Sequence, residues 1–264
     1  MMARFGIGRV FATGVRIFAR NLPRFLAIAA VLSLPYVAWV LALLWDPLRG
    51  VVALYYEVLY RHPVLRALPG GGLVVHTCIA AAVTHGALVA LTGQPAPIGR
   101  GLSTAARRFF PVIGVALVVW LATTGVVTAL RPLVWSSRPS GLEIWGTALC
   151  STVLHSLFYL AVPVATVERR GVVGSIVRGI GLARGNRIRV FAIVFVLRGV
   201  SALLYPLILP FAVRKGASEL YLLILFGHEV VFSLLGAVIA AVAYRLLRED
   251  KEGPDAGELV KVFE

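Results

Sequence analysis

The sequence predicts an all-α fold: a polytopic membrane helical bundle of six transmembrane helices, with interfacial amphipathic helices on the cytoplasmic side. Two observations lead to this prediction. Hydrophobic residues make up 59% of the 264 residues and charged residues only 14%, which leaves too little polar surface to cover a water-soluble globule. Apolar windows of about 20 residues, long enough to cross the hydrocarbon of a bilayer, also recur along the chain.

Six of these windows are expected to be transmembrane helices, at residues 25–45, 70–92, 110–130, 144–167, 190–211 and 220–244. Arginines interrupt the apolar sequence before the first window, so this segment is not expected to be a cleaved signal peptide. We expect residues 1–248 to form a single six-helix membrane domain. Residues 249–264 are expected to form a short cytoplasmic tail.

The distribution of basic residues predicts the orientation of these helices. If the N-terminus is cytoplasmic, the cytoplasmic segments contain 18 of the 26 Lys and Arg residues, and the outer loops contain seven. This asymmetry is typical of the positive-inside rule, so both termini are predicted to be cytoplasmic. The membrane therefore accounts for the net charge of +14. No nucleic-acid partner is expected, because no base-stacking module accompanies the basic residues.

Two segments predict helices that lie flat on the membrane surface. Before the first window, apolar side chains form a stripe almost opposite the arginines, and this stripe consists of Phe11, Val15, Phe18, Leu22 and Phe25. Between the fourth and fifth windows, the apolar side of a second helix consists of Val172, Val173, Ile176, Val177 and Ile180. Gly185 and Asn186 are expected to end this second helix. Such helices bury their apolar side among lipid head groups.

Basic side chains of the cytoplasmic segments are expected to contact anionic lipid head groups of the inner leaflet. Each basic residue near such a surface contributes about 1 kcal/mol. The predicted contacts are Arg9, Arg16, Arg20, Arg100, Arg107, Arg178, Arg184 and Arg187. The alternative is that these segments are charged linkers solvated by water.

The chain also contains a short internal repeat. The segments GRVFATGVR (8–16) and GRGLSTAAR (99–107) share Gly, Arg, Thr and Arg in register, and each leads into an outward span. A third segment near 178–184 fits loosely. A threefold plan of interfacial helix, outward span and returning span would account for all three. The alternative is a chance match in a membrane chain of low complexity.

Ionisable side chains inside the predicted helices indicate a functional site or a structural pair, because an unpaired charge in hydrocarbon is costly. Arg198 and Glu229 lie on neighbouring predicted helices and are expected to meet. His228 adjoins Glu229, and His155 lies at a similar depth. We expect a partnered pair that fixes the register of the two helices. The alternative is a polar site for a lipid head group or a translocated ion.

The sequence lacks the common catalytic and metal-binding motifs. It contains no GxSxG and no HExxH, and no close pair of carboxylates lies inside the predicted spans, so no catalytic residue is predicted. It contains no HxxxH or CxxC spacing, so neither a metal nor another cofactor is expected.

Two motifs resemble a known family. The first is PVATVE at residues 163–168, followed by Gly171 and a basic, apolar helix that ends in ARGNR. The second ends the last predicted span and comprises Tyr244, Leu247, Arg248, Lys251, Glu252 and Gly253, then Leu259, Val260 and Phe263. In these motifs the chain resembles the bacterial integral-membrane family known as the glycerophosphoryl diester phosphodiesterase membrane domain.

The resemblance implies a fold and a location. In some relatives the membrane module precedes a phosphodiesterase barrel, but this sequence ends about 20 residues after the last predicted span. We therefore expect a stand-alone member without catalytic activity, located in the bacterial inner membrane.

The predicted function is that of a non-catalytic inner-membrane protein that is lipid-associated, membrane-organising or a membrane partner subunit. Its partners are expected to be anionic lipids, with a homo-oligomer or a membrane-protein partner left open. The alternative is a small transporter or channel with a midplane polar site around Arg198, His228 and Glu229.

Overall fold

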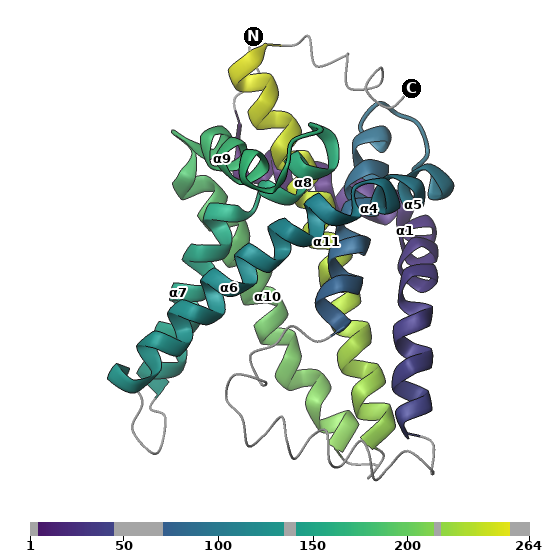
Figure 1. Cartoon of the computed structure of the whole chain (residues 1–264), viewed down its shortest axis with the longest axis vertical. Coiled ribbons are helices and arrows are strands. Elements are labelled where there is room, and N and C mark those ends of the chain that lie inside the picture. The colour runs from purple at the N-terminus through teal and green to yellow at the C-terminus, as the bar shows by residue number, and fades with distance from the viewer. Residues whose placement is uncertain (1–4, 45–70, 135–140, 214–217, 254–264) are drawn as a thin grey trace.

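The computed structural model describes residues 5–44, 71–134, 141–213 and 218–253, and all regular secondary structure in these ranges is helical. The all-α prediction is confirmed for this part of the chain. The helices are α1 (Ile7–Leu44), α4 (Gly71–Ala90), α5 (Ile98–Arg107), α6 (Phe109–Val134), α7 (Gly141–Phe158), α8 (Ala161–Val167), α9 (Val172–Ala183), α10 (Arg187–Val213) and α11 (Ser218–Glu252). Figure 1 shows α5, α8 and α9 gathered at one end, from which the long helices extend, with α6 and α7 slanting away from the others.

Five helical segments within the described ranges are long and apolar enough to cross a membrane. They are Ile7–Ala38, Leu73–Ala90, Phe109–Val126, Gly146–Val167 and Phe226–Glu252. Each overlaps one of the predicted windows. The remaining window, residues 190–211, lies within α10, a helix of 27 residues that is not among the five. The chain therefore has the helices of a membrane-embedded protein.

The predicted surface helix and the predicted first span form one helix, α1, with Pro23 inside it. Its first turns run across the packed end of the bundle, and the rest of the helix runs down beside α4 (Figure 1). Contacts trace this path: Arg189 Nη1 donates to the Phe5 carbonyl oxygen at 2.8 Å, and the Ala96 amide donates to Asn21 Oδ1 at 3.1 Å. Proline removes a helical hydrogen bond and bends a helix, so Pro23 accounts for the change of direction.

The predicted fourth span is divided into two helices. α7 ends at Phe158, and α8 begins at Ala161. At this break the Tyr159 hydroxyl donates to the carbonyl oxygen of Gly236 in α11 at 3.0 Å. All seven residues of α8 except Val162 are buried. The break thus directs α8 into the packed end, where it contacts α6, α9 and α11.

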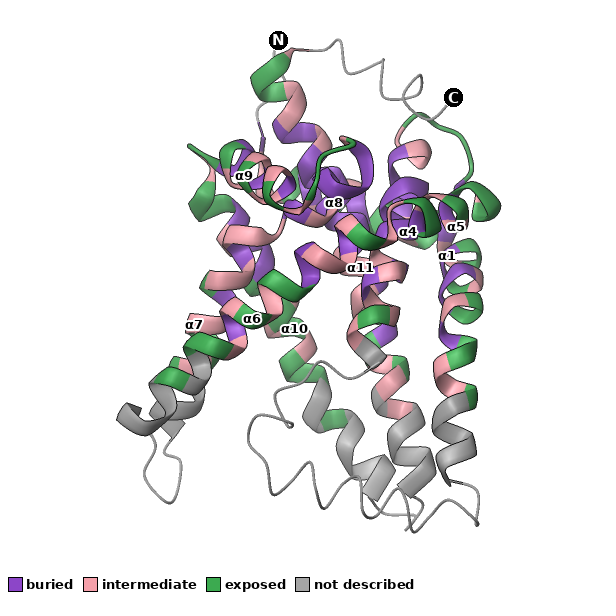
Figure 2. Cartoon of the chain, in the orientation of Figure 1, coloured by how far each residue is buried: buried purple, intermediate pink, exposed green. Residues whose placement is uncertain are grey.

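Buried residues concentrate where the short helices meet the ends of α4 and α11 (Figure 2). The largest fully buried side chains include Phe5, Phe25, Tyr244 and Leu247. Elsewhere, large apolar side chains on the long helices are exposed, as Leu203 is at 71%. Exposed apolar side chains carry no penalty when lipid tails surround them. The molecule therefore has a protein-like core at one end and lipid-facing helices beyond it.

A glycine allows two helices of the core to approach closely. A Cβ at Gly179 of α9 would lie 3.0 Å from the backbone nitrogen of Ala161 and 3.2 Å from its Cα. Real Cβ atoms rarely come so close to backbone, which cannot move aside as a flexible side chain can. Gly179 therefore allows α9 to rest directly on the start of α8.

We predict that Gly179→Ala lowers the stability of the protein by about 1–3 kcal/mol, because the added methyl overpacks this contact. Gly181→Ala is the matched control on the same helix, since a Cβ there meets nothing within 4 Å. It should be neutral or stabilising by up to about 1 kcal/mol through helix propensity. Thermal unfolding in detergent would measure both variants. Equal midpoints for the two would contradict the packing of α9 on α8.

Candidate functional site

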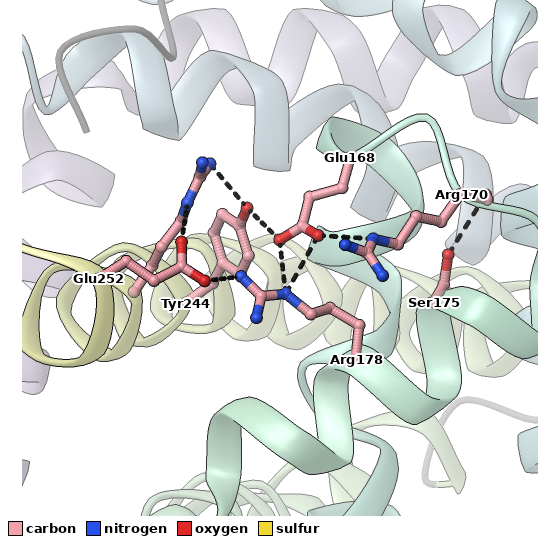
Figure 3. A network of polar contacts seen from close by, with 7 residues as sticks. Glu168, Arg170, Ser175, Arg178, Tyr244 and Glu252 are labelled. Carbon is pink, nitrogen blue, oxygen red and sulfur yellow. Dashed lines mark hydrogen bonds and ion pairs between the residues drawn. The ribbon is translucent and has the colours of Figure 1, made fainter. Parts of the chain in front are cut away.

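A single carboxylate joins three helices at the packed end. Glu168 is the residue after α8, and its side chain is 11% exposed. Arg178 Nε and Arg170 Nε lie 3.1 Å and 3.0 Å from its Oε2, and the Tyr244 hydroxyl donates to its Oε1 at 2.9 Å. Figure 3 shows these donors converging from α9, from the loop before it, and from α11. Every oxygen of this carboxylate thus has a partner.

Local backbone geometry brings these donors together. α8 ends at Val167, and Arg169 adopts a φ of +20°, so the chain reverses before α9 begins at Val172. Ser175 Oγ donates to the Arg170 carbonyl oxygen at 3.3 Å and closes this turn. The reversal places Arg178, two turns into α9, over the carboxylate that precedes the turn.

A second carboxylate extends the cluster along α11. Arg178 Nη2 forms an ion pair with Glu252, the last residue of α11. Arg248 Nε donates to Glu252 Oε2 at 2.8 Å, and Arg248 Nη1 donates to the Tyr244 hydroxyl at 3.3 Å. Tyr244, Arg248 and Glu252 are four residues apart, so they lie on one face of the helix. We call this cluster the Glu168 network; its members are Glu168, Arg170, Arg178, Tyr244, Arg248 and Glu252.

The Glu168 network holds Arg178 in its charged form. Burial alone lowers the pKa of this guanidinium, but the hydrogen bonds and charges of Glu252 and Glu168 outweigh burial and raise it above its ordinary value. Lys251 adds a contact by donating from Nζ to the Gly181 carbonyl oxygen at 2.7 Å, near the C-terminal end of α9. A cation at this end also interacts favourably with the negative end of the α9 helix dipole. The network therefore holds α9 against α11. Its arginines are already paired with its own carboxylates, Glu168 and Glu252.

The predicted head-group arginines divide into two classes. Arg178 belongs to the Glu168 network, so its charge is directed at the protein's own carboxylates. The other seven are exposed, and within the described ranges none of them forms an ion pair with a carboxylate: Arg9, Arg16, Arg20, Arg100, Arg107, Arg184 and Arg187. They lie on α1, α5, the end of α9 and the start of α10, around the packed end of the molecule. We call this surface the basic end.

The predicted intramembrane residues lie where α10 meets α7 and α11. Arg198 Nη1 lies 2.8 Å from His155 Nδ1 of α7, and the charge of Glu229 on α11 also acts on Arg198. Ser201 Oγ, one turn further along α10, lies 3.4 Å from His228 Nε2 of α11. Glu229 is exposed on α11. α10 thus makes polar contacts with both α7 and α11, and Arg198 has a contact with His155 that the sequence did not predict.

His155 Nδ1 lies between two groups of opposite kind. It is 2.8 Å from Arg198 Nη1, which can only donate, and 2.9 Å from the Ser151 carbonyl oxygen, which can only accept, so one tautomer satisfies only one of the two contacts. The described residues contain no group of three or more His, Cys, Asp or Glu side chains arranged to hold a metal ion.

Sequence reasoning did not predict the Glu168 network, although the sequence contains its signal. Glu168, Tyr244, Arg248 and Glu252 all belong to the two motifs that resemble the membrane-domain family. Their four-residue spacing on α11 indicates a polar stripe. What the sequence cannot supply is that the two motifs, 76 residues apart at Glu168 and Tyr244, lie in contact.

No protein-family model matches the chain, and comparisons with curated proteins and with solved structures found no match. The resemblance therefore rests on the motif residues.

We predict that Glu168→Gln destabilises the protein by about 2–4 kcal/mol, because two guanidiniums lose their shared carboxylate in a largely buried place. Glu249→Gln is the matched control. It breaks the 2.7 Å pair with Arg245 on the same helix as Glu252, which is a more exposed i,i+4 pair and should cost about 0.5 kcal/mol. Thermal unfolding and limited proteolysis of α9 would measure the difference. Similar losses of stability in both variants would contradict the conclusion that Glu168 holds the packed end together.

Proposed function

We propose that this chain is a non-catalytic protein of six transmembrane helices in the bacterial inner membrane, whose basic end binds anionic phospholipid head groups of the cytoplasmic leaflet. One observation carries the proposal: seven exposed arginines surround one end of the bundle without carboxylate partners among the described residues. Anionic lipid head groups would neutralise these charges. Each contact would contribute about 1 kcal/mol.

The acidic residues of this end support the proposal, because most of them are already paired with arginines of the protein. Glu168, Glu249 and Glu252 each pair with at least one arginine of the protein. Their charges are therefore not available to the seven arginines of the basic end. The positive field of this surface is left for an external anion.

The exposed apolar side chains of α9 favour lipid as that partner. Val173 and Val177 are 74% and 64% exposed, and they lie one turn apart on the same side of the helix. Ser175, Gly179 and Leu182 are buried on the side that faces the protein. α9 thus turns Ser175, Gly179 and Leu182 to the core and Val173 and Val177 outward, as an interfacial helix does.

Two more side chains at the basic end show the same pattern. Phe110 and Ile188 are each 83% exposed, and each lies next to or near an arginine, at the start of α6 and of α10 respectively. Apolar side chains of this size beside cations suit the boundary between head groups and acyl chains.

The proposed role is lipid-associated, either organising the membrane locally or serving as a membrane subunit for a partner. Membership of the membrane-domain family is proposed on the resemblance of the two motifs, whose residues meet in the Glu168 network. Because Glu168 and Glu252 are both saturated by arginines, the network suits a structural role better than a catalytic one.

We predict that the wild-type protein in nanodiscs of mixed composition enriches phosphatidylglycerol over phosphatidylcholine, and that added salt weakens this enrichment by screening. The triple variant Arg9→Gln, Arg16→Gln, Arg20→Gln should lower the enrichment. The same three positions changed to Lys should retain it, because the charge is kept. Lipid analysis of purified nanodiscs measures all three. If the Gln and Lys variants behave alike, charge is not the cause.

Reporter fusions can test the predicted orientation of the chain in the membrane. A reporter that is active only in the periplasm should be active when fused after residue 57 and silent when fused after residue 180. The basic end would then face the cytoplasm, as the positive-inside rule requires. The reverse pattern of activity would place the arginines on the outer leaflet.

A further inference from the structure

Two arginines lie close together where the start of α6 meets the start of α9. Arg108 joins α5 to α6, and Arg169 lies in the turn between α8 and α9. Gly114 of α6 lies against Val172, the first residue of α9, because a Cβ at Gly114 would overlap the Val172 side chain. This contact brings together the two chain segments that carry Arg108 and Arg169.

The charges of these two arginines act on each other. Burial and the charge of Arg169 both lower the pKa of Arg108, and no described carboxylate raises it. Salt screens exposed charges from each other beyond about 10 Å, so the two guanidiniums are near neighbours. Arg178 differs, because Glu252 and Glu168 raise its pKa. The fold thus holds two like charges together at this place without neutralising them.

The protein supplies no anion to this pair of arginines. Within the described ranges, neither Arg108 nor Arg169 forms an ion pair with a carboxylate. Glu168 precedes Arg169 in the chain, but its carboxylate is occupied by the donors of the Glu168 network, as Figure 3 shows. A bound anion would relieve the repulsion between the two guanidiniums. Arginine forks bind the oxygens of a phosphate group in pairs, so phosphate suits this place.

The backbone at Arg169 is strained. This residue is exposed and has a φ of +20°, a conformation that residues other than glycine rarely adopt. Such strain persists where the surrounding structure enforces it, and it is concentrated at functional sites. At this position it fixes the direction in which the chain leaves α8.

The surroundings favour a lipid over a free phosphate ion. Phe110 follows Arg108 by two residues and stands edge-on to the Phe109 ring, with 5.4 Å between the ring centroids. Val173 follows Arg169 by four residues. Phe110 and Val173 are both largely exposed. Apolar side chains beside cations suit the boundary between head groups and acyl chains. An acyl chain would cover them, and a free ion would not.

We infer that Arg108 and Arg169 together bind the phosphate of one phospholipid, and that this site prefers a phosphomonoester head group, as in phosphatidic acid, to a phosphodiester head group. A phosphomonoester carries a charge of about −1.5 to −2 at pH 7 and three terminal oxygens, which match two guanidiniums better than the single charge of a phosphodiester. The inference rests on the proposed function in that this end lies at the lipid surface. It adds a site outside the seven arginines of the basic end.

Native mass spectrometry tests the site by titrating the purified protein with phosphatidic acid or phosphatidylglycerol of the same acyl chains. The wild type should bind one phosphatidic acid more tightly than one phosphatidylglycerol. Arg108→Gln and Arg169→Gln should each weaken the first binding of phosphatidic acid by about tenfold, the effect of one lost charge-assisted hydrogen bond, and abolish the preference. Arg245→Gln removes the same charge from an arginine paired with Glu249, so this control should keep the preference.

A second variant at position 169 separates binding from folding. Glycine adopts a positive φ without strain, so Arg169→Gly should unfold near the wild-type temperature and still lose the preference for phosphatidic acid. Thermal unfolding in detergent measures the first expectation, and the lipid titration measures the second. A folded Arg169→Gly protein that keeps the preference would overturn the site.

The triple variant Arg9→Gln, Arg16→Gln, Arg20→Gln separates the site from the basic end. It should weaken the binding of both lipids alike and keep the ratio of their affinities, whereas loss of the ratio would overturn the site. Equal binding of the two lipids to the wild type would also overturn the site, but it would leave the proposed function standing.

Two further arms complete the test. If one phosphatidic acid still binds tightly while phosphatidylglycerol is not preferred over phosphatidylcholine, the proposed function fails and the site stands. Inorganic phosphate and glycerol 3-phosphate should not displace phosphatidic acid at equal concentration. Displacement by either would show that the acyl chain plays no part, and it would overturn the lipid site.

Discussion

The carboxylate of Glu168 is the interaction on which the packed end of the molecule depends. It accepts from Tyr244 of α11 and pairs with Arg178 of α9, while its own position after α8 ties the third helix to both. A carboxylate with so little exposure would be costly without these donors. The same contacts fix the rotation of α9, and this rotation turns Val173 and Val177 outward. The amphipathic surface of the basic end thus follows from one buried charge.

Lipid as the solvent explains why such contacts matter here. Between helices in a bilayer there is little hydrophobic driving force, because lipid tails are as apolar as leucine, so close packing and polar contacts hold the helices together. Both kinds occur at the packed end. Gly179 lets α9 approach the backbone of Ala161, and the Tyr159 hydroxyl reaches the Gly236 carbonyl across the break between α7 and α8. Beyond this end the long helices expose apolar side chains to lipid.

Hydropathy was sufficient to predict helices and most of their positions, because the length of an apolar window is a local property of the chain. It was not sufficient for features that depend on tertiary contacts. The break after Phe158 falls inside one apolar window and is visible only through the partner that Tyr159 finds on α11. Likewise, depth along a helix suggested Glu229 as a partner of Arg198, and its charge does act on Arg198, but only the packing of α10 against α7 reveals the contact with His155. Neither rotation nor neighbour order is encoded in hydropathy.

The arginines between residues 169 and 189 show how geometry divides residues that composition treats alike. Arg170 lies in the turn after Glu168 and Arg178 lies on the helix that follows it. Both arginines pair with the Glu168 carboxylate, so their charges stabilise the fold. Arg184 and Arg187 follow the end of α9, where the described carboxylates of the network are already paired. The positive-inside rule counts all four equally, because it reflects insertion rather than packing. Of these four arginines, Arg184 and Arg187 form no ion pair with a described carboxylate, so their charge remains open to a partner outside the protein.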